Sequence, residues 1–327
     1  MSVCPYLDGL EYCVFDIETT GFSAQSCTLI SASFYYPGSG ECFQLFCDEP
    51  GLEAALIKDC CARLSECDAV ITYNGDSFDL PFMNRRAVAS GAAPGLPFFK
   101  SLDIYKYLKR YWPAAKIMDS LSQRSVEAAL GLSDERSDRI DGGECVELYK
   151  NWLRTGDEGI KNTILLHNGD DVRQLGRIFD SLNFLPWQII AFYEGYPLRL
   201  PENSADLLSA ASETGAYKKA FVRECKIDGS CLSVRGIAQP GGISVSIYNE
   251  NYEFEYSALS GVFKLKLPLI ASDGILIADL QKLPVKEDNY AVYPGFGSGY
   301  LVLSSSGHVN ALEANSLTRG MLDRLMR

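Results

Sequence analysis

Two acidic residues, Asp16 and Glu18, stand two positions apart in a stretch whose other residues are mostly β-branched or aromatic. This composition from Tyr12 to Glu18 predicts a strand that enters the core. Side chains alternate between the two faces of a strand, so both carboxylates point the same way, with Cα atoms roughly 6 to 7 Å apart. Neighbouring carboxylates repel and are costly to desolvate, which favours a divalent cation between them. The alternative is that the pair lies on a solvated sheet face and that Gly21 only makes the turn.

A third acid, Asp79, follows an Asn74-Gly75 turn signal and comes shortly before Pro81. Proline suits the first turn of a helix, so a helix is predicted from Pro81 through Val88, with Asp79 at or just before its N-terminus. An isolated aspartate in such a position is usually a capping residue, and this interpretation stays open.

A further helix is predicted from Ile160 to Leu182, because apolar residues recur there at helical period. At about 100° per residue, Asp171 falls in the middle of the apolar stripe and His167 lies beside it one turn earlier, whereas Asp170 falls toward the polar side. An acid centred on a buried stripe contradicts the pattern that packs the helix, and such violations tend to mark functional sites. The alternative is a core histidine paired with Asp171 at i, i+4.

The stretch Lys100–Arg124 is the most basic in the chain, and its lysines and arginines interleave with aromatic residues. That composition is typical of a surface that contacts phosphates and stacks on bases. Helical spacing, however, places Tyr107, Tyr111 and Trp112 on one face with Ile104, which predicts that these aromatics belong to the core. Only the basic face stays a candidate nucleic-acid surface, and an ordinary solvated face is the alternative.

The chain has 327 residues, of which 47% are hydrophobic, enough for two domains with separate cores. It contains no run of 18 apolar residues and no basic start followed by an apolar stretch, so we expect a soluble, cytoplasmic protein without membrane contact. The 11 cysteines include no Cys-x2-Cys pair, which favours reduced core cysteines over a disulfide framework or a zinc site. A formal charge of -12 argues against a high-affinity nucleic-acid coat but is compatible with an acidic metal site acting on phosphates.

The first half of the chain alternates strands and helices. Strands are predicted at 27–36, 41–47 and 69–73. A turn at Pro37–Gly40 joins the first two of these strands. An amphipathic helix is predicted at 53–64. This order predicts an α/β domain at 1–185 that consists of a mixed sheet flanked by helices.

Past residue 185 the composition changes, and prolines interrupt the chain. We expect a helical connector at 186–220, with a short helix from Asn203 to Leu208. Short alternating runs separated by turns predict a smaller all-β sandwich or barrel at 221–327, closed by a terminal helix from about Leu312 to Met326. No motif there points to chemistry, so this domain is expected to orient substrate, to bind a partner or to be only a structural addition.

Considered together, the acidic motifs resemble the DEDD 3′ to 5′ exonucleases, the DnaQ-like branch of the ribonuclease H-like superfamily. More narrowly, residues of about 10–182 resemble the YprB-type ribonuclease H-like family. The matching motifs are Phe15-Asp-Ile-Glu-Thr-Thr-Gly21, Tyr73-Asn-Gly-x-x-Phe-Asp-Leu-Pro-Phe82 with Arg86 after it, Asp119-Ser-Leu-Ser-Gln-Arg-Ser-Val-Glu127, and His167-Asn-x-x-Asp-Val172.

The resemblance implies that Asp16, Glu18, Asp79 and Asp171 hold two divalent cations, Mg²⁺ or Mn²⁺, with Asp16 bridging both. Oxygen ligands suit such hard cations. His167 is then expected to orient the attacking water or take its proton. Members of the superfamily that use histidine place it five residues before the last aspartate, whereas His167 lies four residues before Asp171, which is the spacing of the tyrosine branch. The expected substrate contacts, which lie in or beside the same motifs, are Thr19, Asn74, Phe78 and Arg86.

These inferences predict a two-metal-dependent nuclease that hydrolyses phosphodiester bonds of DNA or RNA. We expect it to be a 3′ to 5′ exonuclease that acts on single-stranded ends. The alternative is a non-catalytic, nuclease-like binding or scaffold module in which the β domain is the interaction unit. The intact set of acids argues against this alternative, because a decayed site is expected to lose at least one carboxylate.

Overall fold

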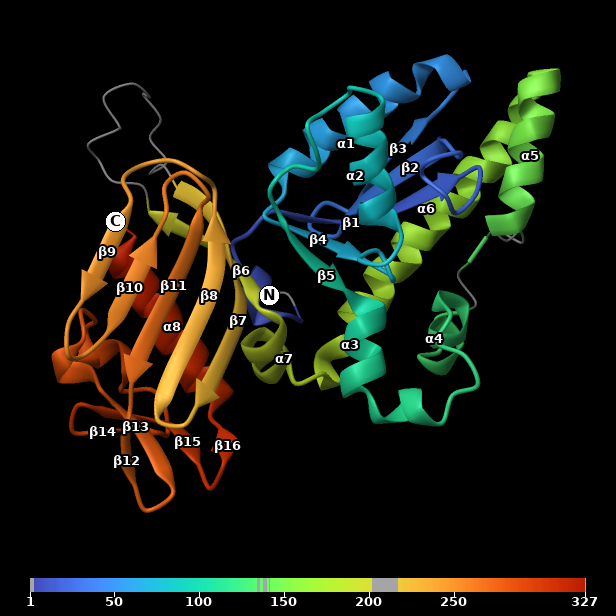
Figure 1. Cartoon of the computed structure of the whole chain (residues 1–327). Coiled ribbons are helices and arrows are strands. Elements are labelled where there is room, and N and C mark those ends of the chain that lie inside the picture. Colours follow the sequence, from blue (N-terminus) through green and yellow to red (C-terminus); the bar gives the residue numbers. More distant parts are fainter. Residues whose placement is uncertain (1–2, 134–135, 138–139, 141, 202–216, 327) are drawn as a thin grey trace. The chain divides into compact units, whose positions relative to one another are not determined.

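The computed structural model describes residues 3–133, 136–137, 140, 142–201 and 217–326. The chain forms two compact units, Met1–Leu185 and Pro186–Arg327, called here the N-terminal and C-terminal units (Figure 1). Among the described residues, no helix is both long enough and apolar enough to cross a membrane.

The N-terminal unit is built on a five-stranded mixed sheet with the strand order β3-β2-β1-β4-β5. Its strands are β1 (Tyr12–Thr19), β2 (Leu29–Tyr36), β3 (Glu41–Phe46), β4 (Ala69–Thr72) and β5 (Lys100–Asp103). The first three are antiparallel neighbours, whereas β4 runs parallel to β1 and β5 runs parallel to β4. Gly40, with a φ of 74°, supplies the left-handed conformation at the tight β2–β3 turn. A parallel return needs a crossover, which α1 (Glu53–Glu66) provides on the way to β4.

Strand β1 lies in the middle of this sheet, and its alternate residues face different layers. Cys13, Phe15 and Ile17 pack in the core formed with α1 and α2 (Asp79–Ala89). The acids Asp16 and Glu18 face α6 (Glu158–Asp180), which lies across the opposite face of the sheet. The period-2 alternation of a strand therefore separates an apolar face from an acidic one.

Helix α6 packs closely on the sheet because its contact face carries small residues. At Gly176 a Cβ atom would lie 2.6 Å from the ring of Tyr35, so only glycine permits this approach. Helix α5 (Gly142–Thr155) packs on α6, and the two share a small core with β2. The buried members of that core are Ile30, Cys145, Tyr149, Trp152 and Ile164. Figure 1 shows α1 and α2 on one side of the sheet and α5 and α6 on the other.

The basic stretch Lys100–Arg124 differs from its sequence-based prediction at its start. Its first four residues form β5, a short edge strand that was missed because all of its residues except Leu102 are polar or charged. Helix α3 (Ile104–Tyr111) follows, with Ile104 and Tyr107 buried as predicted and its lysines and arginine exposed. Helix α4 (Gln123–Ala129), which was also not predicted, comes next.

The described residues of the C-terminal unit form two antiparallel sheets. The first has the order β6-β7-β8-β11-β10-β9, and the second has the order β12-β13-β15-β14 with β16 paired to β15. The strands of the first sheet are β6 (Tyr196–Pro201), β7 (Tyr217–Asp228), β8 (Cys231–Ala238), β9 (Val245–Tyr248), β10 (Glu253–Tyr256) and β11 (Val262–Pro268). Those of the second are β12 (Ile270–Ser272), β13 (Ile275–Asp279), β14 (Phe296–Gly297), β15 (Tyr300–Ser305) and β16 (His308–Val309).

The prediction of an all-β C-terminal part with a terminal helix is confirmed, because α8 (Ala311–Leu325) follows the last strand. Burial alternates along β11, so Phe263, Leu265 and Leu267 point into the core. Within 186–220, α7 (Trp187–Glu194) and β6 belong to this unit, since β6 pairs with β7. The short helix expected from Asn203 to Leu208 lies outside the described residues.

Candidate active site

Three elements bring the candidate catalytic side chains to one cavity. Asp16 and Glu18 come from β1, Asp79 is the first residue of α2, and His167 and Asp171 come from α6. All five line the same cavity, which has a volume of about 540 Å³. Residues separated by most of the N-terminal unit in sequence therefore share one site.

The carboxylates of Asp16, Glu18 and Asp171 form the tightest acidic group of this cavity. One oxygen from each residue lies within 4.8 Å of one oxygen from each of the others. Such a set of hard oxygen donors fits a divalent cation of the Mg²⁺ or Mn²⁺ kind. Glu18 is buried, and Asp16 and Asp171 are half-buried. A cation between these oxygens would offset their mutual repulsion.

Asp79 does not act as the cap of α2, because the N-cap position is Phe78. The Asp79 side chain instead reaches β1, where its Oδ1 accepts a hydrogen bond from the Ile17 backbone N–H at 3.3 Å. The fourth acid is thereby held against the strand that carries Asp16 and Glu18.

Burial and neighbouring carboxylates raise the pKa of two of these acids. Burial raises the pKa of Asp16 well above its usual range, the neighbouring charges of Asp79, Asp171 and Glu18 raise it further, and the Asn168 hydrogen bond lowers it. Burial also raises the pKa of Asp79 to about 7, with backbone hydrogen bonds opposing the shift and Asp103 and Asp171 adding to it. The ionised forms of these two acids are thus poorly stabilised by their surroundings, as expected of residues that bind cations.

His167 lies between two carboxylates. Its Nε2 is 3.4 Å from Glu18 Oε1 and 3.5 Å from Asp171 Oδ2. The i, i+4 pair with Asp171 that the sequence allowed is therefore present, but the imidazole also contacts Glu18 on β1 and lines the cavity. A side chain in this position can hold a water or a proton at the acidic cluster.

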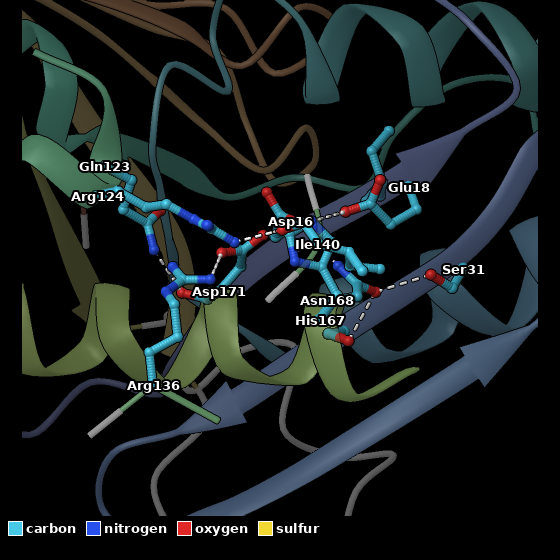
Figure 2. A network of polar contacts seen from close by, with 12 residues as sticks. Asp16, Glu18, Ser31, Gln123, Arg124, Arg136, Ile140, His167, Asn168 and Asp171 are labelled. Atoms are coloured by element: carbon cyan, nitrogen blue, oxygen red, sulfur yellow. Dashed lines mark hydrogen bonds and ion pairs between the residues drawn. The ribbon is translucent and has the colours of Figure 1, made fainter. Parts of the chain in front are cut away.

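Asn168, which the sequence-based reasoning did not select, connects Asp16 to the sheet. Its Nδ2 donates to Asp16 Oδ2 at 2.8 Å, and its Oδ1 accepts from Ser31 Oγ at 3.0 Å and from Ser33 Oγ at 2.7 Å (Figure 2). Ser33 Oγ in turn accepts from Gln44 Nε2 at 2.8 Å. Asn168 and both serines are fully buried. The sequence contains two signals for this network. Asn168 directly follows His167, and Ser31 and Ser33 stand two positions apart on β2.

Asp171 is paired with an arginine that was also not predicted. Arg136 Nη1 lies 2.6 Å from Asp171 Oδ1, and Arg136 Nη2 lies 2.7 Å from Glu127 Oε1 (Figure 2). Gln123 Nε2 donates to the backbone carbonyl of Asp171 at 2.9 Å. Gln123 and Glu127 belong to the 119–127 motif of the family resemblance, and that motif could have indicated this contact.

The position expected for Asp170 was wrong. This side chain is buried rather than on the polar side of α6, and its Oδ2 accepts from the Ser137 backbone N–H at 2.7 Å. Ser137, which follows α4, contacts that side of the helix, and periodicity within the helix cannot reveal such a contact.

The four expected substrate contacts divide into two groups. Asn74 and Phe78 line the cavity. Thr19 is buried outside the cavity lining, and its Oγ1 donates to the Gly21 carbonyl at 2.9 Å. Arg86 is also absent from the lining, because its guanidinium is bound to the Glu53 carboxylate and to the Ala24 carbonyl.

Two further cavity residues have side chains suited to a nucleic acid. Phe22 is 91% exposed and packs edge-to-face on Phe78, with ring centroids 5.9 Å apart. Arg124 lines the cavity together with Arg136. An exposed aromatic ring beside arginines is the combination that stacks on bases and contacts phosphates.

Several solved structures are similar to parts of this chain. Similar solved structures include the family B DNA polymerase of Pyrobaculum calidifontis, with 19% identity over 51% of this chain and 24% of that chain and a TM-score of 0.42. Brucella melitensis NrnC shows 17% identity over 55% of this chain and 86% of that chain, with a TM-score of 0.30. An ExoI/SSB-Ct complex shows 12% identity over 97% of this chain and 70% of that chain, with a TM-score of 0.31.

The chain spans about a quarter of the length of the polymerase. No curated protein matches the chain. Residues 13–183, more than half of the chain, match the RNase H superfamily. The chain belongs to the RNase H superfamily.

Proposed function

We propose that this protein is a metal-dependent nuclease that hydrolyses phosphodiester bonds in single-stranded DNA or RNA. The observation that carries the proposal is the convergence of Asp16, Glu18 and Asp171 oxygens within 4.8 Å, in a cavity that Asp79 and His167 also line. Among the other residues that line the cavity, Arg124 and the exposed ring of Phe22, which packs on Phe78, match the phosphates and planar bases of such a substrate.

Asp16, Glu18, Asp79 and Asp171 would hold the divalent cations. When bound, two such ions supply an activated water and stabilise the leaving oxygen of an in-line displacement. Asn168 fixes the orientation of Asp16 by its hydrogen bond to Oδ2. His167 orients the attacking water through Nε2 and accepts its proton, because a positioned imidazole nitrogen is a common general base in hydrolysis.

The substrate end enters the cavity beside Phe22 and Phe78. A terminal base stacks on the exposed Phe22 ring, and Arg124 contributes positive charge toward the backbone phosphates. The narrower proposal is a 3′ to 5′ exonuclease of the YprB type, as the sequence resemblance implies. A formal charge of -12 then limits binding to short contacts at the cavity, because there is little general attraction for a phosphate backbone.

A cleavage assay on the purified full-length chain tests the proposal. Single-stranded DNA and RNA labelled at the 5′ end are incubated with Mg²⁺, with Mn²⁺ or with EDTA. We expect metal-dependent shortening of the labelled strand one nucleotide at a time, which reports attack from the 3′ end. Release of the labelled nucleotide first would contradict the direction, and internal cleavage would contradict the exonuclease mode.

Asp16→Asn is the matched loss-of-function variant, and Asp180→Asn is its control because Asp180 is the exposed last residue of α6. Asp16→Asn is expected to lose on the order of 10³ in rate, corresponding to several kcal/mol of lost metal-assisted stabilisation. Equal activity in both variants, or no metal-dependent cleavage of either polymer, would refute a nuclease site at this cluster and favour a binding module.

A further inference from the structure

A second group of potential metal ligands shares part of the catalytic cavity. Glu18, Cys145 and His167 each offer one ligand atom, and these three atoms lie within 4.8 Å of one another. They come from β1, α5 and α6, respectively. Exposure is 7% for Glu18, 5% for His167 and 0% for Cys145. We refer to this group as the Glu18–Cys145–His167 cluster.

The donor set of this cluster differs from that of the acidic group. A thiolate, an imidazole and a carboxylate are the ligands that zinc uses in proteins, whereas Mg²⁺ and Mn²⁺ favour oxygen. Three protein ligands with an open fourth position are also a common form of zinc site. The cluster therefore suits a softer cation than the neighbouring carboxylates do.

The geometry supports the same assignment. Zinc bonds to nitrogen and oxygen of about 2.0–2.1 Å in a tetrahedral site place two such ligands about 3.4 Å apart. The His167 Nε2 to Glu18 Oε1 distance is 3.4 Å. Side-chain adjustment of Cys145 then completes the site, and its thiol proton is released to solvent when the thiolate binds.

An ion can reach the cluster from the catalytic cavity. Glu18 and His167 line that cavity, and so does Gly142 at the start of the helix that carries Cys145. Cys145 itself lies in the small core between α5 and α6 with Tyr149 and Trp152. This packing holds the Cys145 sulfur next to the cavity, and Cys145 is not among the residues that line it.

We propose that Glu18, Cys145 and His167 bind zinc and that zinc occupancy inhibits the nuclease. Glu18 and His167 cannot serve zinc and the catalytic cluster at the same time, so zinc removes one proposed Mg²⁺ ligand and the proposed water-orienting group. The inhibition rests on the proposed nuclease function, whereas zinc binding by the cluster does not.

A spectroscopic experiment tests binding without any activity. Co²⁺ replaces Zn²⁺ as the probe and is titrated into the reduced full-length chain, with the near-ultraviolet thiolate-to-cobalt charge-transfer band as the readout. The wild type and Cys60→Ser are expected to show the band, and Cys145→Ser and Cys145→Ala are expected to lack it. Cys60 is the matched control because it is equally buried in the same unit but lies outside the cluster.

An absent band in the wild type overturns the proposal, and so does a band that persists in both Cys145 variants. Thermal unfolding of each variant without metal shows which of the two Cys145 substitutions retains the fold. Serine keeps the side-chain size and alanine removes the donor entirely, so either folded variant decides the result.

A second experiment measures inhibition of Mg²⁺-dependent cleavage by added Zn²⁺. Loss of the thiolate is expected to raise the half-inhibitory zinc concentration at least about tenfold in Cys145→Ser relative to Cys60→Ser. Equal inhibition of the two variants means that zinc acts at the carboxylates alone and overturns the regulatory proposal. Absence of cleavage before zinc is added counts against the nuclease function, while the cobalt band still reports the cluster.

Discussion

Asn168 donates a hydrogen bond from Nδ2 to Asp16 Oδ2 at 2.8 Å and so ties a residue of α6 to the central strand of the sheet. Because Ser31 and Ser33 both donate to Asn168 Oδ1, the amide has one orientation and must present its nitrogen to Asp16. The other carboxylate oxygen of Asp16, Oδ1, is not part of this hydrogen bond, and Asp16 lines the cavity. Asn168 is a positioning residue that acts through Asp16.

Replacing Asn168 by alanine is expected to lower the cleavage rate by about 10- to 100-fold, the usual effect of losing an outer partner of a metal ligand. Two buried serine hydroxyls lose their acceptor, so the free energy of unfolding should also fall by about 1 to 3 kcal/mol. The decisive readout is the Mg²⁺ concentration for half-maximal activity, which should rise. A rate loss with unchanged metal dependence would show that Asn168 only stabilises the fold.

Replacing His167 by alanine is expected to lower turnover by about 10²- to 10⁴-fold, because a positioned general base is lost. The pH dependence of turnover between roughly pH 6 and 9 should change as well, because the side chain that takes the proton is missing. His308→Ala is the control, since His308 is exposed in the C-terminal unit. Near wild-type turnover of His167→Ala across that range would exclude its role with the water.

Asp79 makes the stability of the metal-free protein depend on pH. Its pKa is 3.8 ordinarily and about 7 in the folded chain, so between about pH 4 and 7 the folded state binds more protons than the unfolded state. Stability in EDTA should therefore fall as pH rises through this window and level off above it, by a few kcal/mol in total. Thermal unfolding at a series of pH values measures this slope.

Asp79→Asn should reduce that slope, to which the raised pKa of Asp16 also contributes, and should raise the Tm of the metal-free protein at pH 8. Mg²⁺ or Mn²⁺ should raise the Tm of the wild type more at pH 8 than at pH 5, because the cation binds the ionised carboxylates. Parallel Tm profiles of the wild type and Asp79→Asn in EDTA would contradict the assignment of the slope to Asp79.

Phe22 offers a test of the stacking surface. Truncation to alanine should weaken binding of a single strand by about 5- to 150-fold, corresponding to about 1 to 3 kcal/mol for one stacked base. The Tm of the Phe22→Ala variant should equal that of the wild type, because the Phe22 side chain is 91% exposed. Leu259→Ala removes a side chain of similar exposure, 92%, and should leave binding unchanged. Equal effects of the two substitutions would remove Phe22 from the substrate path.

Arg86 should behave in the opposite way. Its guanidinium is paired with Glu53, which also accepts from the Leu29 backbone N–H at 2.9 Å. Arg86→Ala leaves that buried carboxylate without its charge partner and should cost about 3 kcal/mol of stability. At a temperature where the variant is folded, its KM for single strands should match that of the wild type. A raised KM with an unchanged Tm would restore Arg86 as a substrate contact.

Patterns within single elements predicted much of this site. Alternation along one strand placed Asp16 and Glu18 on a common face, and helical period placed His167 beside Asp171. The same reasoning failed for Asp170, because the segment that buries it follows a different helix. The pairing of Arg86 with Glu53 likewise left no local pattern, because Glu53 lies on another helix 33 residues away.

The amino-acid sequence by itself determined the α/β character of the N-terminal unit, the β-rich character of the C-terminal unit and the candidate acids, because periodicity and local motifs are short-range properties. Only the tertiary structure decided which groups meet: Asn168 with Asp16, Arg136 with Asp171, and Cys145 with Glu18 and His167. These contacts depend on how α5 and α6 pack with the sheet and on where Arg136 meets α6, and packing between distant elements leaves no local pattern in the chain.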